Sequence, residues 1–166
     1  MTHRPFNVLF LCAGNTARSV LAEGILRKDG ADKFNAFSAG SQPKGVVNPF
    51  AIKTLAALGY PTGGYRSKSW DEYAVAGAPQ MDFIFTVCDN AAGETCPVWP
   101  GHPTTAHWGV EDPAAVEGLD IDKERAFALA FKQLRNRISV FINLPFDTLS
   151  EIALREHLRA IGKQTD

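Results

Sequence analysis

Short apolar runs alternate with helix-like segments along the whole chain, and this alternation limits the possible folds more than any other feature. The apolar runs are typical of buried strands and lie at 8–11, 34–39, 81–87 and 104–108. The helix-like segments lie at 16–28, 49–58, 69–73, 122–143 and 148–161, with Asp147 as the expected N-cap of the last. Such alternation predicts parallel βαβ units. We therefore expect a small, doubly wound, three-layer α/β/α sandwich with a four-stranded parallel sheet, its first strand in the middle, plus an extra C-terminal helix.

The segment 122–143 has the clearest helical pattern in the chain. Its large apolar side chains are spaced by four, three, four and three residues, at Phe127, Phe131, Leu134, Ile138 and Phe141. This spacing places them in one stripe along a helix. The stripe is expected to pack on the core.

Length and composition describe one ordinary globular domain. The chain has 166 residues, 45% of them hydrophobic, and a formal net charge of −1, which suits a single sizeable core. We expect 1–145 to form this domain and 146–166 to be a helical extension of it. The charge balance argues against nucleic-acid binding, and no run is apolar or basic enough to involve a membrane. No signal peptide is apparent, so we expect a cytoplasmic protein that is a monomer or a weak homodimer.

The first strand leads into the stretch Cys12 to Ser19, which combines a nucleophile with an anion cradle. A strand, a tight loop and a helix start point backbone N–H groups at a tetrahedral oxyanion. Cys12 is the expected nucleophile and Arg18 a bidentate clamp. The helix N-terminus, the loop amides and Arg18 are expected to lower the pKa of Cys12, and Ser19 to donate its hydroxyl to the sulfur. Gly14 and Asn15 suit the positive φ that such a loop needs.

The loop residues expected to bind the oxyanion are Ala13, Gly14, Asn15, Thr16, Ala17 and Arg18. A lone cysteine is more often a small buried apolar residue, and a cysteine six residues before an arginine is common by chance. The strand before this stretch, the turn residues within it and the helix after it favour the functional interpretation.

Three chemically apt residues follow strands at the same edge of the expected sheet. Cys12 follows the first strand, Cys88 the third and Asp112 the fourth, and ligands of such folds bind beyond the carboxyl ends of the strands. Adjacent strands lie about 4.8 Å apart, and a disulfide joins Cα atoms about 5.5 Å apart. Cys12 and Cys88 are therefore within reach of each other for a redox role. The alternative for Cys88 is a cysteine packed at a strand end.

A general acid and a third thiol complete the candidate set. Asp112 precedes Pro113 in a loop that is expected to fold over the thiolate, where a carboxylic acid can protonate a departing oxygen. Glu111 is a rival for this role, and a turn-capping aspartate is the simpler alternative. Cys96 lies on a segment of small residues able to bring it to Cys88; the alternative is an incidental exposed thiol.

The odd count of three cysteines favours reactive or metal-binding thiols over static disulfides. A zinc site would use Cys88, Cys96, His102 and His107. Seven residues separate the cysteines, five separate Cys96 from His102, and four separate the histidines. Structural zinc sites have a much closer cysteine pair, so this spacing argues against zinc.

From Cys12 to Ser19 the chain resembles the low-molecular-weight protein tyrosine phosphatase superfamily. Three further segments resemble its arsenate reductase branch, namely Thr86-Val87-Cys88-Asp89, Glu94-Thr95-Cys96-Pro97 and His107-Trp108-Gly109-Val110-Glu111-Asp112-Pro113-Ala114. The resemblance covers nearly the whole chain up to the long helix. It departs from the three-cysteine pattern in the segment between Cys88 and Cys96, which is slightly longer.

The resemblance implies a role for each of the candidate residues. Cys12 attacks the oxyanion, Arg18 clamps it, Asp112 acts as the acid, and Cys88 and Cys96 carry out the redox steps. The resemblance also implies a possible potassium ion behind the loop, at Asn15, Glu23, Ser38, Ser69 and Asp71. No tightly bound cofactor is expected otherwise.

We therefore expect an arsenate reductase, with phosphate or sulfate as mimics of arsenate. Cys12 attacks arsenate, Cys88 then attacks Cys12 and releases arsenite, and Cys96 takes over the disulfide. Thioredoxin, or glutathione with glutaredoxin, resets the enzyme. The alternative is a low-molecular-weight protein tyrosine phosphatase that hydrolyses phosphate monoesters through a Cys12 phosphocysteine. The extra cysteine pair argues against it, as does the lack of an aromatic residue after Asp112-Pro113. A non-catalytic oxyanion- or zinc-binding module is the third possibility.

Overall fold

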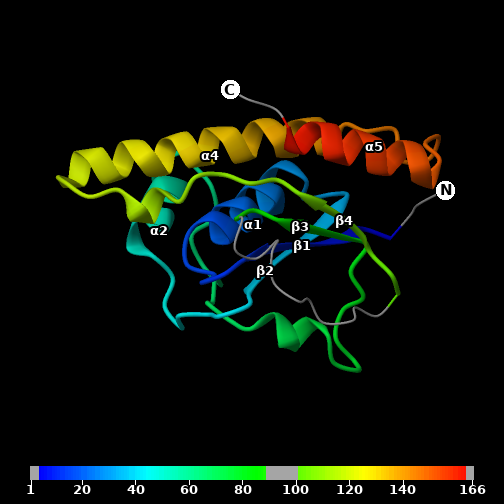
Figure 1. The fold of residues 1–166 in the computed structure, drawn as a ribbon, viewed down its shortest axis with the longest axis horizontal. Coiled ribbons are helices and arrows are strands. Elements are labelled where there is room, and N and C mark those ends of the chain that lie inside the picture. Colours follow the sequence, from blue (N-terminus) through cyan, green and yellow to red (C-terminus); the bar gives the residue numbers. More distant parts are fainter. Residues whose placement is uncertain (1–3, 89–100, 164–166) are drawn as a thin grey trace.

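A parallel sheet forms the centre of the molecule. The computed structural model describes residues 4–88 and 101–163. Its strands are β1 (Phe6–Cys12), β2 (Phe34–Gly40), β3 (Phe83–Thr86) and β4 (Thr104–His107). They pair in the order β2-β1-β3-β4, all parallel, so β1 and β3 are neighbours (Figure 1). The predicted four-stranded parallel sheet, with its first strand inside, is confirmed.

The helices follow the strands as the alternation predicts. They are α1 (Arg18–Asp29), α2 (Pro49–Ala57), α4 (Asp120–Ile142) and α5 (Glu151–Gly162), with the short 3-10 helices η1 (Trp70–Tyr73) and η2 (Pro113–Ala115). No helix in the described part of the chain is long and apolar enough to cross a membrane. The fold is therefore the expected α/β type, with α5 as an additional helix at the C-terminal end.

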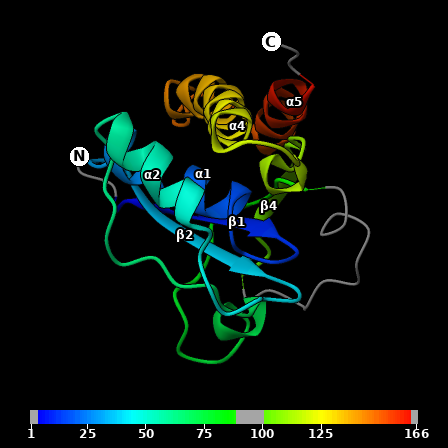
Figure 2. The same ribbon diagram turned by 90° about the vertical axis from the view of Figure 1, so that its left-hand side faces the viewer.

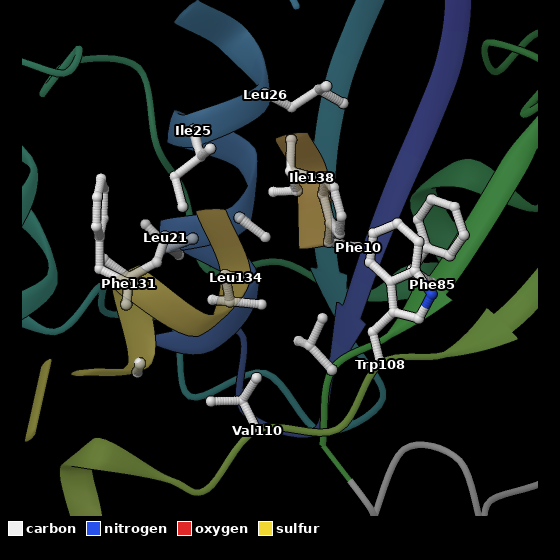
Figure 3. Close-up of a cluster of buried hydrophobic side chains, with 14 of the residues drawn as sticks. Phe10, Leu21, Ile25, Leu26, Phe85, Trp108, Val110, Phe131, Leu134 and Ile138 are labelled. Atoms are coloured by element: carbon white, nitrogen blue, oxygen red, sulfur yellow. The ribbon is translucent and has the colours of Figure 1, made fainter. Parts of the chain in front are cut away.

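One face of the sheet carries the main core. Phe10 of β1 and Phe85 of β3 point to this face, where α1 and α4 cover them (Figure 3). All five members of the predicted stripe on α4 are buried, namely Phe127, Phe131, Leu134, Ile138 and Phe141. Trp108 stacks on Phe85, with ring centroids 3.7 Å apart. The long helix is thus held by the aromatic side chains of the sheet.

The opposite face is covered by a thinner layer. Leu9 and Leu11 of β1 alternate with their neighbours onto this side, where they meet Trp70 and Met81. Both faces of β1 are therefore buried, as expected for an inner parallel strand. In the described residues this layer consists of η1 and its flanking chain, whereas α1, α2, α4 and α5 lie together on the other side (Figure 2). The predicted third layer is present there as a short helix and irregular chain.

Helix starts follow local capping chemistry. Asn48 caps α2 by accepting a hydrogen bond from the Phe50 N–H (2.8 Å), with Pro49 at the first position. The prediction that Asp147 caps the last helix is wrong. Ser150 is the cap, and its Oγ accepts the N–H of Ala153 (3.1 Å). The chain before Ser150 forms a turn on the carbonyl of Pro145, which delays the helix start.

Candidate active site

The loop between β1 and α1 brings Cys12 and Arg18 to the carboxyl edge of the sheet. Cys12 is the last residue of β1 and Arg18 the first of α1. Asn15 has a φ of +49°, in the left-handed region that asparagine tolerates better than most residues. Gly14 was expected to share this conformation, but it has no positive φ. Asn15 is therefore the residue of this loop with a left-handed backbone.

Buried hydrogen bonds hold the Asn15 side chain in place. Its Nδ2 donates to the Oγ of Ser19 (2.8 Å) and to the Oγ of Ser38 (3.1 Å). Its Oδ1 accepts the backbone N–H of Lys68 (2.9 Å). The expected donation from Ser19 to the Cys12 sulfur stays a prediction, since the bond found at Ser19 Oγ comes from Asn15. These hydrogen bonds fix the loop in place and offset the conformational free energy that the left-handed backbone of Asn15 costs.

Replacing Asn15 with alanine is expected to lower the free energy of unfolding by about 3 kcal/mol, because buried hydrogen bonds are lost and the left-handed backbone becomes strained. Urea unfolding measures this change. The matched control is Asn35→Ala, which removes an exposed hydrogen bond to Asn7 (3.0 Å). The control is expected to cost less than about 1 kcal/mol. Equal losses in the two variants would contradict the assigned role of Asn15.

Cys88 lies directly against the start of the loop. Its sulfur accepts the backbone N–H of Ala13 at 3.2 Å. Cys12 and Cys88 are 4% and 1% exposed, respectively, and both carry thiols in the structure. This placement follows from the pairing of β1 with β3, in which Leu11 is opposite Thr86. The predicted meeting of the two cysteines at the sheet edge is present, while Cys96 lies outside the described residues.

The pKa of Cys12 is raised, not lowered as expected. The main cause is the hydrogen bond with the Cys88 side chain, followed by burial and by the charge of Cys88. The charge of Arg18 and the backbone N–H of Asn15 act in the opposite direction but are outweighed. The expectation failed because it counted the cradle and left out a second buried thiol beside the first.

Removing the second thiol is therefore expected to make Cys12 ionise at lower pH. In Cys88→Ala, the pH profile of Cys12 alkylation by iodoacetamide should move to lower pH, because both contributions of Cys88 to the raised pKa disappear. The rate is followed by mass spectrometry of the peptide that contains Cys12, so the reaction of Cys96 does not interfere. Cys96→Ala serves as the matched control. A profile that stays in place or moves upward would show that Cys88 does not hold the proton on Cys12.

Arg18 connects the loop to the segment after β4. Its Nη1 donates to the carbonyl of Val110 (3.0 Å), and its Nη2 lies 3.6 Å from Asp112 Oδ2. Its Nε is buried, with no hydrogen-bond partner among residues 4–88 and 101–163. An unpartnered N–H in a buried guanidinium is costly unless a ligand satisfies it. This donor fits an oxyanion held above Cys12.

Asp112 uses its two carboxylate oxygens differently. Oδ1 accepts the N–H of Ala114 (2.9 Å) and caps η2, whereas Oδ2 is the oxygen near Arg18. Both roles considered for Asp112, a turn-capping residue and a general acid, are thus compatible with the structure. The Asp112 side chain is 41% exposed and borders a hollow of about 510 Å³ that also contains Arg18 and Cys88. Glu111 lines the same hollow, so the rivalry between these two carboxylates stays open.

The C-terminal helix and the long helix brace this segment, which the sequence did not indicate. Buried Arg137 of α4 donates to the carbonyls of Trp108 (3.2 Å) and Gly109 (2.8 Å). The Trp108 indole N–H donates to the carbonyl of Leu158 in α5 (2.9 Å). Gly162 packs so closely that a Cβ there would lie 2.3 Å from the carbonyl oxygen of His107. A charged residue beside an apolar stripe was the one available signal for Arg137.

Gly162→Ala is expected to lower the free energy of unfolding by about 1–3 kcal/mol, because the added methyl group overlaps backbone that cannot move easily. Thermal unfolding measures the effect. Gly63→Ala is the matched control, since a Cβ at Gly63 meets no atom within 4 Å. If both substitutions prove neutral, the close packing of α5 against this segment is contradicted.

The residues implied for a potassium ion are largely bonded to one another. Ser38 Oγ donates to Glu23 Oε1 at 2.6 Å, and the other Glu23 oxygen pairs with Arg27. Ser69 Oγ accepts the N–H of Asp71 (3.1 Å) and caps η1. A protein cation already lies beside the Glu23 carboxylate, and its oxygens are in use. The possible potassium ion stays a prediction, and in residues 4–88 and 101–163 no group of three His, Cys, Asp or Glu side chains is placed to hold a metal.

Comparison with known proteins gives consistent matches. The model of the low molecular weight phosphotyrosine protein phosphatase family matches residues 7–150. An arsenate reductase of Halalkalibacterium halodurans is 35% identical over 134 residues, which cover 81% of this chain and 93% of the relative. An arsenate reductase of Bacillus subtilis is 33% identical over the same coverage.

Solved structures are similar over most of the chain. An arsenate reductase in the phosphate binding state matches with a TM-score of 0.67 and 26% identity, over 82% of this chain and 96% of that one. The arsenate reductase of Archaeoglobus fulgidus matches with a TM-score of 0.57 and 27% identity, over 80% and 98%. The tyrosine phosphatase Wzb of Escherichia coli K30, in complex with sulphate, shares the fold, with a TM-score of 0.60 and 20% identity over 84% and 97%.

Proposed function

The chain belongs to the low molecular weight phosphotyrosine protein phosphatase family, and from this premise we propose that it reduces arsenate to arsenite with its own cysteines. The observation that carries the proposal is the contact of Cys88 with the loop, where its sulfur accepts the N–H of Ala13 at 3.2 Å. Hydrolysis through Cys12 has no need of a second thiol at this place. Reduction needs one, because an electron pair must come from sulfur.

In the first step the sulfur of Cys12 attacks arsenic and an oxygen of arsenate leaves. The free Nε of Arg18 and the N–H groups of the loop bind the remaining oxygens. Asp112 gives its proton to the departing oxygen, which leaves as water. Since the pKa of Cys12 is raised, we propose that its proton passes to an arsenate oxygen as the substrate enters. Phosphate and sulfate fit the same cradle as mimics.

In the second step Cys88 attacks the sulfur of Cys12. A disulfide forms, the sulfur–arsenic bond breaks, and its electron pair stays on arsenic, which leaves as arsenite. Cys96, which lies outside the described residues, is proposed to attack Cys88 in turn and free Cys12. Thioredoxin, or glutathione with glutaredoxin, then supplies two electrons. Such a cycle needs thiols kept reduced, which fits the cytoplasm.

Phosphate ester hydrolysis is the second candidate function. The match to a phosphatase family favours it, and Cys12, Arg18 and Asp112 serve both reactions equally in the first step. The chain has Ala114 after Asp112-Pro113, where tyrosine phosphatases of this type carry an aromatic residue. We therefore propose hydrolysis as a side activity.

A direct comparison of both reactions tests the proposal. Arsenite is measured during arsenate-dependent NADPH oxidation, once with thioredoxin and its reductase and once with glutathione, glutaredoxin and glutathione reductase. Hydrolysis of para-nitrophenyl phosphate is measured on the same preparation. We expect sustained arsenite formation with at least one reductant and weak hydrolysis. Strong hydrolysis without arsenite would assign the protein to the phosphatases instead.

A further inference from the structure

A groove runs between β4 and α5 beside the candidate active site. Its volume is about 510 Å³, in the range of pockets that hold small molecules. Thr105 and His107 line it from the strand. Arg155 and Arg159 line it from the helix, and Lys163 lines it from the turn that ends the helix. The groove is therefore bounded by the edge strand of the sheet on one side and by the C-terminal helix on the other.

The helix side of the groove is strongly cationic. Arg155 and Arg159 are spaced by four residues, so they lie on one side of α5, and Lys163 follows four residues later at the C-cap of the helix. No acidic side chain is among the described residues that line the groove. An ion pair joins Arg155 of this row to Glu151 (2.9 Å). A row of cations in a chain with a net charge of −1 is a local excess that attracts carboxylates.

The groove adjoins the hollow of the active site, and the contact of Gly162 with His107 lies between them. His107 and Gly162 line both the groove and the hollow that contains Arg18 and Cys88. A molecule whose carboxylates rest on α5 can therefore extend toward the sulfur of Cys88. Helix α5 begins at Glu151, beyond the residues 7–150 that match the family model. The cationic row is thus an addition to the matched region.

We propose that this groove binds the carboxylates of a small anionic thiol, which reduces the disulfide between Cys12 and Cys88. The inference rests on the proposed function, because that disulfide forms as arsenite leaves, and the small thiol attacks Cys88 in place of Cys96. Glutathione, with two carboxylates and one thiol, is the natural probe of this class. The row on α5 holds its carboxylates, and its sulfur faces Cys88.

The electrons balance over two thiols. The first thiolate attacks the sulfur of Cys88, a mixed disulfide forms, and the Cys12–Cys88 bond breaks with its electron pair on Cys12. A second thiolate attacks the mixed disulfide and releases Cys88 and the oxidised thiol dimer. The protons of the two thiols end on Cys12 and Cys88. Two electrons enter per cycle, as many as the reduction of one arsenate consumes.

Binding is tested first without chemistry. S-methylglutathione carries the same carboxylates but no thiol, and its binding to the full chain is measured by calorimetry. The double variant Arg155→Gln/Arg159→Gln should weaken binding about tenfold or more, because charge-assisted hydrogen bonds are lost. The matched control is Arg125→Gln/Lys132→Gln, which makes the same change of charge on exposed positions of α4 outside the groove. The control should bind like the wild type.

Kinetics then connect the groove to reduction. With glutathione as the only reductant, the KM for glutathione should rise about tenfold in the groove variant, in line with the binding loss, while the KM for arsenate should not change. Circular dichroism and thermal unfolding check that each variant is folded. The control variant should keep both KM values.

Each other outcome has a distinct meaning. Absence of S-methylglutathione binding, or equal binding by the groove and control variants, would overturn the groove assignment. Binding of inorganic phosphate but not of S-methylglutathione would also overturn it, because the groove would then be a site for small inorganic anions. Turnover with thioredoxin but none with glutathione would also overturn it and leave arsenate reduction intact. Failure of the proposed function would be visible separately, as absence of arsenite with every reductant.

Discussion

Replacing Cys12 with serine is expected to abolish arsenate reduction and phosphate ester hydrolysis together, by at least about 10⁴-fold, because the loss of a nucleophile removes the shared first step. A serine hydroxyl ionises far less readily than a thiol and cannot enter a disulfide. The two assays are arsenite formation and hydrolysis of para-nitrophenyl phosphate on the same preparation. Their parallel loss would identify one sulfur as the centre of both reactions.

The serine variant also separates chemistry from binding. Cys12 is 4% exposed, and serine replaces the sulfur by a smaller atom, so the fold and the anion cradle should persist. Phosphate binding, followed by calorimetry, should remain because Arg18 Nε and the loop amides are unchanged. Residual arsenite formation at a sizeable rate would mean that another thiol starts the reaction, and Cys12 would lose its role.

Cys88→Ser is expected to separate the two reactions. Sustained arsenite formation should fall to the background, because the adduct on Cys12 then has no internal thiol to release it. Hydrolysis of para-nitrophenyl phosphate should stay within about tenfold of the wild type, since only the ionisation of Cys12 is altered in the first step. Ordinary arsenate turnover in this variant would contradict a relay through Cys88.

Cys96→Ser is the matched cysteine replacement for that experiment. Loss of turnover in both variants, with hydrolysis retained, would support a relay that uses all three thiols. If turnover is lost in Cys88→Ser but kept in Cys96→Ser, the reductant must act directly on the Cys12–Cys88 disulfide. That outcome also fits direct reduction of this disulfide by a small thiol in the β4–α5 groove.

Much of the fold could be predicted because local patterns were unambiguous. The stripe on α4 follows from the spacing of its apolar residues alone. The meeting of Cys12 and Cys88 could be predicted as well, because it needs just the ends of two adjacent parallel strands. The position of Asp112 near Arg18 follows from the same reasoning about strand ends, and its role as the acid stays a prediction.

The remaining features depend on contacts between distant segments. The raised pKa of Cys12 requires knowing that the Cys88 side chain bonds to it. The role of Arg137 requires knowing that the segment at Trp108 and Gly109 crosses α4 at that point. The close packing of Gly162 likewise depends on where α5 docks. No pattern of spacing encodes such pairings.

The bracing of the segment after β4 limits how the site opens. The Trp108 amide donates to the Thr86 carbonyl (2.7 Å) and the Val110 amide to Val87 (3.1 Å), while α4 and α5 hold the same stretch from the other side. These amide protons should exchange with solvent at rates near those of the central strands, since no small opening releases them. The carboxylate of Asp112 is therefore presented by a rigid rim, so we expect it to keep its position beside Arg18 throughout a reaction cycle.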